Sequence, residues 1–181
     1  WSKSSEYEVL FQNLAKSSLT PDVTYFSLLR PFHEIRIVEM FAKYPQYFNQ
    51  FTSCNRGFKI NNPSKSHWCG ECAKCVFVFL LFSAFLKPDD IIKMFGQNLY
   101  RKENLLPLFK DVIGKGTMKP FDCVGTFEEA QTALQMAHDA YNEFPVFQEL
   151  YGLVKPSKKT IEKVFRTSIS PTVPHQFRLP G

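Results

Sequence analysis

Four of the five cysteines fall in one stretch of the chain, where Cys54, Cys69, Cys72 and Cys75 form a C-x14-C-x2-C-x2-C pattern. Two-residue spacings let neighbouring thiolates converge on one ion while the turns point backbone N–H groups at sulfur, and a distant fourth cysteine completes a tetrahedron. The alternatives are disulfides, which the absence of a recognisable secretory signal disfavours, and buried reduced thiols, for which this spacing is unusual. The pattern therefore predicts a bound metal ion.

The donor set indicates which metal this is and what it does. Zinc is favoured over an iron–sulfur cluster because no proline follows Cys75 as it does in the ferredoxin run, although that run also contains C-x2-C-x2-C. Four thiolates leave no open coordination position, so the zinc is expected to be structural and not catalytic. His67 is a further possible ligand, but four sulfurs already suffice.

Two cations follow Cys54 closely in the sequence, at Arg56 and Lys59. The metal would pin their loop to the start of an apolar helix, and both cations are candidates for binding a diphosphate or a carboxylate of a substrate through charge-assisted hydrogen bonds. The alternative is a pair of solvated surface cations. The sequence thus predicts a metal-clamped basic loop as a candidate anion site.

A second group of candidates lies where an expected strand gives way to a helix. Arg30 is a candidate substrate-binding residue there, and His33 and Glu34 are candidates for proton transfer. The alternative for Glu34 is a favourable position against the helix macrodipole. Cys123 is a third candidate acid or base, and its alternative role is that of a small buried residue.

The expected fold class is α/β, because the elements around these residues have α/β signatures. Residues 23–29 are β-branched and aromatic and are bounded by prolines, which favours a buried parallel strand whose partner strands are expected upstream of Trp1. Residues 75–86 form an apolar run too short to span a bilayer and therefore predict a core helix. Thr126 and Glu129 predict a capping box at a helix start.

Helical periodicity predicts the remaining elements. The expected helices cover residues 7–15, 33–44, 89–95, 102–112, 127–141, 146–153 and 158–166. The expected domains are residues 1–87, containing the strand and the zinc knot, a helical extension over residues 88–169, and an extended tail over residues 170–181.

Composition limits the class of protein. The chain has 181 residues, of which 44% are hydrophobic, so it is not a disordered tail or a disulfide miniprotein. A net charge of +5 suits an anionic ligand but is too evenly spread to indicate a nucleic-acid-binding protein. With no secretory signal and no membrane span in the sequence, a cytoplasmic location is expected.

Several motifs together resemble a known family. They are LRPFHE at residues 29–34, SCNR at 53–56, WCGECAKC at 68–75 and PFDCVGT at 120–126. In this order they resemble the carboxy-terminal half of the adenine-nucleotide α-hydrolase-like, pyrophosphatase-loop ATPases. The match is closer to the bacterial UDP-N-acetyl-α-D-muramoyl-L-alanyl-L-glutamate epimerases than to the 7-cyano-7-deazaguanine synthases, and it covers roughly residues 21–150.

The resemblance implies a parallel-sheet fold of the adenine-nucleotide α-hydrolase type and an ATP- and Mg²⁺-dependent reaction of peptidoglycan precursor synthesis. In that reaction the terminal L-Glu of a UDP-N-acetylmuramoyl dipeptide is adenylated, its Cα is inverted, and the acyl-adenylate is hydrolysed. The Ser-Gly-Gly-x-Asp-Ser loop that cradles pyrophosphate in these ATPases is absent from this sequence, and IGKGT at residues 113–117 is a weak substitute. The chain is therefore expected to be a carboxy-terminal portion that is inactive without a nucleotide-binding portion.

Two other functions remain open at this point. A zinc-knotted module that binds nucleic acid or protein fits the positive charge and aromatics such as Tyr44 and Tyr47. A deazaguanine-type ligase would keep the fold and change the reaction. A nucleotide-binding segment elsewhere in the full-length protein would exclude the first of these.

Overall fold

The computed structural model describes residues 4–57, 67–120, 124–155, 157–168 and 170–178. It divides into two compact units, which are described separately here. The smaller unit comprises Trp1–His33 with Arg166–Gly181, and the helical unit comprises Glu34–Phe165. The four clustered cysteines all belong to the helical unit.

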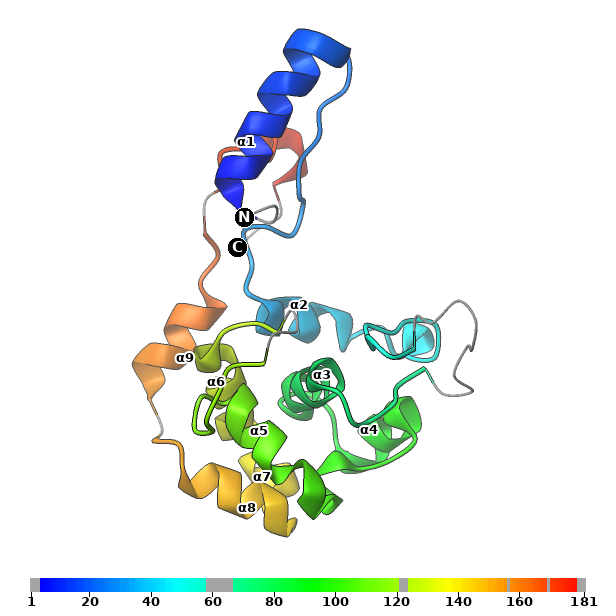
Figure 1. Cartoon of the computed structure of the whole chain (residues 1–181), viewed down its shortest axis with the longest axis vertical. Coiled ribbons are helices and arrows are strands. Elements are labelled where there is room, and N and C mark those ends of the chain that lie inside the picture. The colour runs from blue at the N-terminus through cyan, green and yellow to red at the C-terminus, as the bar shows by residue number, and fades with distance from the viewer. Residues whose placement is uncertain (1–3, 58–66, 121–123, 156, 169, 179–181) are drawn as a thin grey trace. The chain divides into compact units, whose positions relative to one another are not determined.

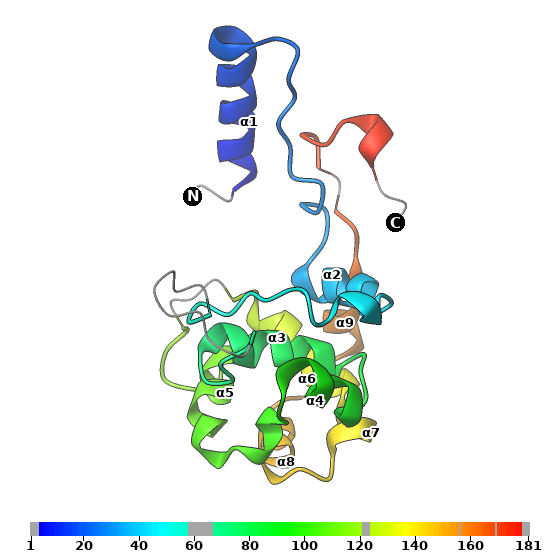
Figure 2. The same cartoon turned by 90° about the vertical axis from the view of Figure 1, so that its right-hand side faces the viewer.

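The helical unit is built around one buried helix. Its elements in chain order are α2 (Glu34–Phe41), the 3-10 turn η2 (Pro45–Tyr47), α3 (Ala73–Ser83), α4 (Pro88–Phe95), the 3-10 turns η3 (Leu99–Arg101) and η4 (Glu103–Leu105), α5 (Leu106–Val112), α6 (Phe127–Met136), α7 (His138–Tyr141), α8 (Pro145–Gly152) and α9 (Lys158–Phe165). Helices α2, α4, α5 and α6 all pack against α3, which lies between them in both views (Figures 1 and 2).

Helix α3 is apolar on every side, which is why it must be surrounded. All of its residues except Lys74 are buried. This confirms the core helix predicted from the apolar run at residues 75–86. Within the part of the chain that is described, no helix is long and apolar enough to cross a membrane.

Aromatic rings fill the space between α3 and its neighbours. Tyr100 is fully buried, with its ring 5.0 Å from that of Phe79 and 5.1 Å from that of Phe147. Its hydroxyl is hydrogen-bonded to Ser83 Oγ at 2.9 Å, and burial raises the pKa of Tyr100 above its ordinary value. The polar atom thus enters the core with a partner, as buried hydroxyls must.

Most predicted helices of this unit are confirmed with small shifts in their ends. The capping box is present: the Thr126 side chain accepts from the Glu129 N–H, and the Glu129 carboxylate accepts from the Thr126 N–H. The helix predicted over residues 127–141 is divided at Ala137 into α6 and α7. The helix predicted over residues 102–112 begins as the 3-10 turn η4, since Pro107 fits only the first turn of α5.

The strand predicted over residues 23–29 is wrong: these residues form an extended loop and a turn. Val23 and Tyr25 are 57% and 46% exposed, so the segment is not buried on both faces. A strand needs a neighbour for its backbone hydrogen bonds, and the described residues contain no β-strand that could supply one. The Tyr25 carbonyl instead accepts from the Gln12 side-chain amide at 2.6 Å. The parallel sheet is accordingly not a feature of the described chain.

The smaller unit contains α1 (Ser5–Leu14), its π-helical continuation η1 (Ala15–Leu19) and the 3-10 turn η5 (His175–Phe177). Helix α1 confirms the helix predicted near residues 7–15. The segment predicted as an extended tail contains η5, and Val173 within it is 1% exposed.

The boundaries between the two compact units lie at residues 33/34 and 165/166. The predicted domain boundaries lie at residues 87/88 and 169/170. Helix α3 lies before the first of these boundaries and packs against α4, α5 and α6 beyond it, so the core continues across it. The predicted domain division stays a prediction.

A buried ion pair stabilises the smaller unit. The Glu8 side chain is 1% exposed and lies 2.6 Å from Arg30. Burial alone favours the protonated form, but hydrogen bonds from Thr172, from Arg30 and from the Ser27 N–H outweigh it and hold the pKa of Glu8 below 4.5. The ionised carboxylate is thus preferred in the folded state.

We expect Glu8→Gln to destabilise the smaller unit at pH 7 by about 1 kcal/mol. A depressed pKa contributes stability above the unfolded value of 4.5, and this contribution is lost as the pH falls through the folded value. The difference between wild type and variant should therefore be smaller in acid, well below pH 4.5, than at pH 7. Hydrogen exchange of the α1 amides at the two pH values measures it, with Glu6→Gln as control. An equal difference at both pH values would contradict the assignment.

Candidate metal centre

The four predicted ligands come together in the folded chain. The Sγ atoms of Cys54, Cys69, Cys72 and Cys75 all lie within 4.8 Å of one another, and those of Cys69 and Cys75 are 3.7 Å apart. A tetrahedron with zinc–sulfur bonds of about 2.3 Å has edges of about 3.8 Å, so the sulfurs stand at nearly the separations that zinc requires. The donor set fits the metal.

The start of α3 positions two of these sulfurs. Cys72 is the N-cap residue of the helix, and its sulfur accepts from the Cys75 N–H at 3.5 Å. Cys75 lies in the first turn, where the positive end of the helix dipole favours a thiolate. The turn before the helix needs Gly70, whose φ of +65° a side chain rarely adopts, and the Glu71 N–H after it donates to Cys69 Sγ at 3.4 Å.

Hydrogen bonds among the thiols and their burial shift the pKa values of the cysteines. A hydrogen bond from Cys75 is the main cause that lowers the pKa of Cys72, to about 4. The same contact raises the pKa of Cys75, and desolvation raises that of Cys69. A divalent ion held by the four sulfurs would displace their protons.

Trp68, the residue before Cys69, packs against two other aromatic rings. Cys54 and Cys75 are fully buried, and Trp68, next to Cys69, is 1% exposed. The Trp68 ring lies 4.5 Å from Phe95 of α4 and 5.4 Å from Phe51. Trp68 thus joins α4 to the loop around residue 51.

The basic loop has only one of its two predicted cations in the described residues. Arg56 is 57% exposed and pairs with Glu71 at 2.9 Å, beside the sulfur cluster. Lys59 lies outside the described residues. An exposed pair of this kind exchanges readily with an incoming anion, because it contributes little to stability.

The second predicted group spans the boundary between the two compact units. Arg30 belongs to the smaller unit, where its guanidinium is bound by Glu8, and His33 is the last residue of that unit's first segment. Glu34 opens α2 in the helical unit. Cys123 lies outside the described residues.

Two side chains at the start of α2 were not among the predicted site residues. Lys74, between the ligands Cys72 and Cys75, lies 3.5 Å from the Glu34 carboxylate and 5.6 Å from the centre of the Phe77 ring. Lys74 could have been singled out in the sequence because it is the one charged residue in an otherwise apolar helix.

Glu129 is the other residue of this kind, predicted only as part of a helix cap. It is 2% exposed, and its second carboxylate oxygen accepts from the Ile35 N–H of α2 at 3.2 Å. One buried carboxylate thereby joins the starts of α2 and α6. A local sequence pattern cannot predict a contact between residues 94 positions apart.

The glycine-containing segment at residues 113–117 is a helix end and not a phosphate-binding loop. Gly114 follows α5 with φ +72°. The Asp111 carboxylate already accepts from the N–H groups of Thr117 and Met118, at 2.9 and 3.3 Å. A phosphate would have to displace a carboxylate that repels it.

Comparison with known proteins agrees with this geometry. Residues 50–164, which contain all four ligands, match the family described as MurL C-terminal domain. Three curated relatives match, each named UDP-N-acetyl-alpha-D-muramoyl-L-alanyl-L-glutamate epimerase. No solved structure is significantly similar to the chain.

The relatives are similar over most of this chain but are much longer. Identity is 35% over 156 residues with the Micromonospora protein and 36% over 135 residues with that of Xanthomonas oryzae pv. oryzae, covering 85% and 74% of this chain. Identity with the Salinispora tropica protein is 35% over 85% of this chain. The matches cover 30–35% of the relatives, so the chain spans about a third of their length. The chain belongs to the MurL C-terminal domain family.

Proposed function

We propose that this chain is the zinc-stabilised carboxy-terminal domain of an ATP-dependent epimerase that converts the terminal L-Glu of UDP-N-acetylmuramoyl-L-Ala-L-Glu to D-Glu. The observation that carries the proposal is the family match over residues 50–164, which includes the complete four-sulfur cluster. The relatives' names supply the reaction. ATP and a nucleotide-linked precursor are metabolites of the cytoplasm, where we place the reaction.

The chemistry explains why ATP is needed. A carboxylate activates its neighbouring Cα–H poorly, because removing that proton would build a second negative charge. Transfer of AMP to the α-carboxylate, with release of pyrophosphate, gives a neutral acyl group, and its Cα proton is far more acidic. A base then takes the proton, an acid returns it from the opposite face, and water releases AMP from the inverted product.

The residues of this chain would serve substrate binding and proton transfer. Arg30, Arg56 and Lys59 are the proposed partners of the substrate's phosphates and carboxylates. His33, Glu34 and Cys123 are the proposed candidates for acid and base. The Lys74 ammonium lies 3.5 Å from the Glu34 carboxylate.

Zinc has a structural part in this proposal. Cys54, Cys69, Cys72 and Cys75 would hold it, and four thiolates leave it no position for a substrate. Its effect is to hold the Arg56 loop against the start of α3, close to Lys74. ATP and Mg²⁺ belong to another portion of the enzyme, because Asp111 occupies the one glycine-containing turn that resembled a phosphate site.

A chimera tests this function. The segment of the Micromonospora relative that this chain matches is replaced by this chain, and the product is incubated with ATP, Mg²⁺ and UDP-N-acetylmuramoyl-L-Ala-L-Glu. We expect D-Glu in the hydrolysed product by chiral chromatography, and none from this chain alone. The unaltered Micromonospora protein is the positive control. A folded, zinc-containing chimera that releases no D-Glu while the control does would refute the proposal.

A further inference from the structure

The smaller unit exposes an unusual amount of apolar surface. Nine of the fifteen large hydrophobic side chains that are exposed in the described residues belong to it. Three of them lie along one side of α1: Val9, Leu10 and Leu14, which are 41–56% exposed and are called the α1 face here. Monomeric proteins rarely leave such contiguous apolar surface in water unless a partner covers it.

The α1 face is not needed for packing within its own unit. The opposite side of the helix already makes those contacts, where Phe11 meets the ring of Tyr25 at 4.9 Å and Glu8 binds Arg30. A side chain such as Leu10, at 56% exposure, is only partly buried within the unit. The face is therefore uncovered within its own unit.

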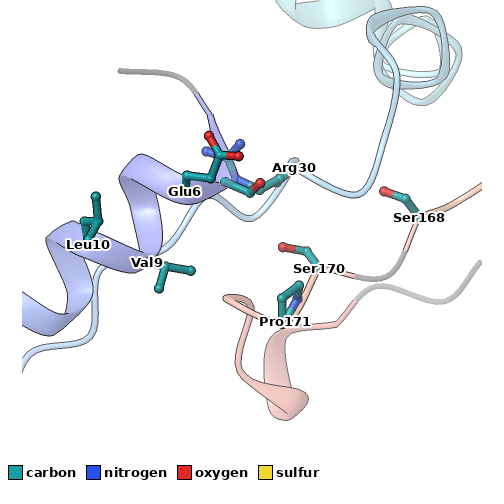
Figure 3. Close-up of a pocket in the computed structure, with 8 residues that line it drawn as sticks. Glu6, Val9, Leu10, Arg30, Ser168, Ser170 and Pro171 are labelled. Atoms are coloured by element: carbon teal, nitrogen blue, oxygen red, sulfur yellow. The ribbon is translucent and has the colours of Figure 1, made fainter. Parts of the chain in front are cut away.

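A groove continues this face. It has a volume of about 600 Å³ and lies between α1 and the segment around Ser168–Pro171. Figure 3 shows Val9 and Leu10 on the helical wall, Ser170 and Pro171 on the other wall, and Arg30 beside Glu6 at one end. Its walls are mainly apolar, and the charge of Arg30 is already compensated by Glu8. The groove fits apolar side chains of a protein better than a small anion.

The comparisons indicate which protein covers the face. The C-terminal domain match spans residues 50–164 and lies wholly inside the helical unit, so the smaller unit falls outside it. The curated relatives carry about two thirds of their length beyond what this chain matches. We propose that the α1 face and its groove are the docking surface for that other portion of the epimerase.

The charges of α1 disfavour a membrane surface as the occupant. The first turn carries Glu6 and Glu8, and Lys16 is the one basic residue between Ser5 and Leu19. Helices that lie on anionic lipid carry lysine and arginine along their polar face. The docking proposal depends on the family membership of the chain. It does not depend on which reaction the assembled enzyme catalyses.

The test is binding without substrate, so it is independent of the epimerase assay. The unmatched portion of the Micromonospora relative is tagged and co-expressed with this chain, and co-purification is measured. The relative's own matching segment serves as positive control for the probe. We expect the wild-type chain to co-purify and Leu10→Glu with Leu14→Glu to lower the recovered chain about tenfold or more.

Two further variants separate binding from folding. Leu153→Glu changes a similarly exposed leucine of the helical unit and should bind like wild type. Leu10→Gln with Leu14→Gln removes the apolar surface without adding charge and should also weaken binding. Unchanged circular dichroism and zinc content show that the variants are folded. Three results overturn the proposal: retention of the double variants at wild-type levels, failure of the wild-type chain where the positive control binds, or a homodimer that the double variants abolish.

Discussion

Replacing Cys72 with serine should remove most of the zinc from the chain and lower the free energy of unfolding by about 3 kcal/mol or more. Cys72 supplies a ligand and also caps α3, since its sulfur accepts the Cys75 N–H. Serine can still cap the helix, so the loss reports the metal–sulfur bond. Elemental analysis gives the zinc content, and urea unfolding with and without added zinc gives the stability. Wild type should bind one zinc ion per chain.

The matched control is Cys123→Ser, the same substitution at the cysteine that lies apart from the others in the sequence. It should keep its zinc and unfold like wild type in the presence and absence of the metal. A chelator should destabilise wild type and the control but leave Cys72→Ser unchanged. Equal zinc content in wild type and Cys72→Ser would show that the four sulfurs are not a metal site.

Truncating Trp68 to alanine should cost about 3–5 kcal/mol of unfolding free energy, as for other large buried aromatics. Trp68 is 1% exposed and contacts both Phe95 of α4 and Phe51 before the first ligand. Its removal would leave a cavity at the point where the metal centre meets the helical core. Thermal and urea unfolding measure the loss, and Tyr47→Ala, at an aromatic residue 48% exposed, should cost far less.

Zinc content shows whether Trp68 acts through packing alone or also through metal binding. Because its side chain is not a ligand, we expect Trp68→Ala to bind zinc with the same stoichiometry but reduced affinity. Trp68→Phe, which keeps an aromatic ring against Phe95, should recover part of the stability. Stability equal to wild type in Trp68→Ala would contradict the role of this residue as the link between centre and core.

Much of the helical unit could be predicted from the sequence, because its signals are local. The apolar run of α3 can only be a core helix, and the Thr126–Glu129 pair can only cap the helix that follows it. The cysteine spacing likewise predicted the convergence of four sulfurs, since two-residue spacings leave few other arrangements.

The prediction of a strand at residues 23–29 is wrong because a strand is not determined by local signals. Its β-branched and aromatic composition is suited to a sheet, but a strand depends on partners, and the described chain has none for it. The grouping of Arg30 with Glu34 stays a prediction, since the boundary between the two compact units falls between them.

By itself, the sequence determined the helices of the core, the four cysteines of the cluster and, through its motifs, the family. The tertiary structure alone decided that Lys74 faces Glu34, that Glu129 reaches Ile35, and that the apolar side of α1 stays uncovered within its unit. The physical reason is that capping, helical periodicity and thiolate spacing act over a few residues. Ion pairs, shared carboxylates and exposed faces depend instead on which distant segments the fold brings together.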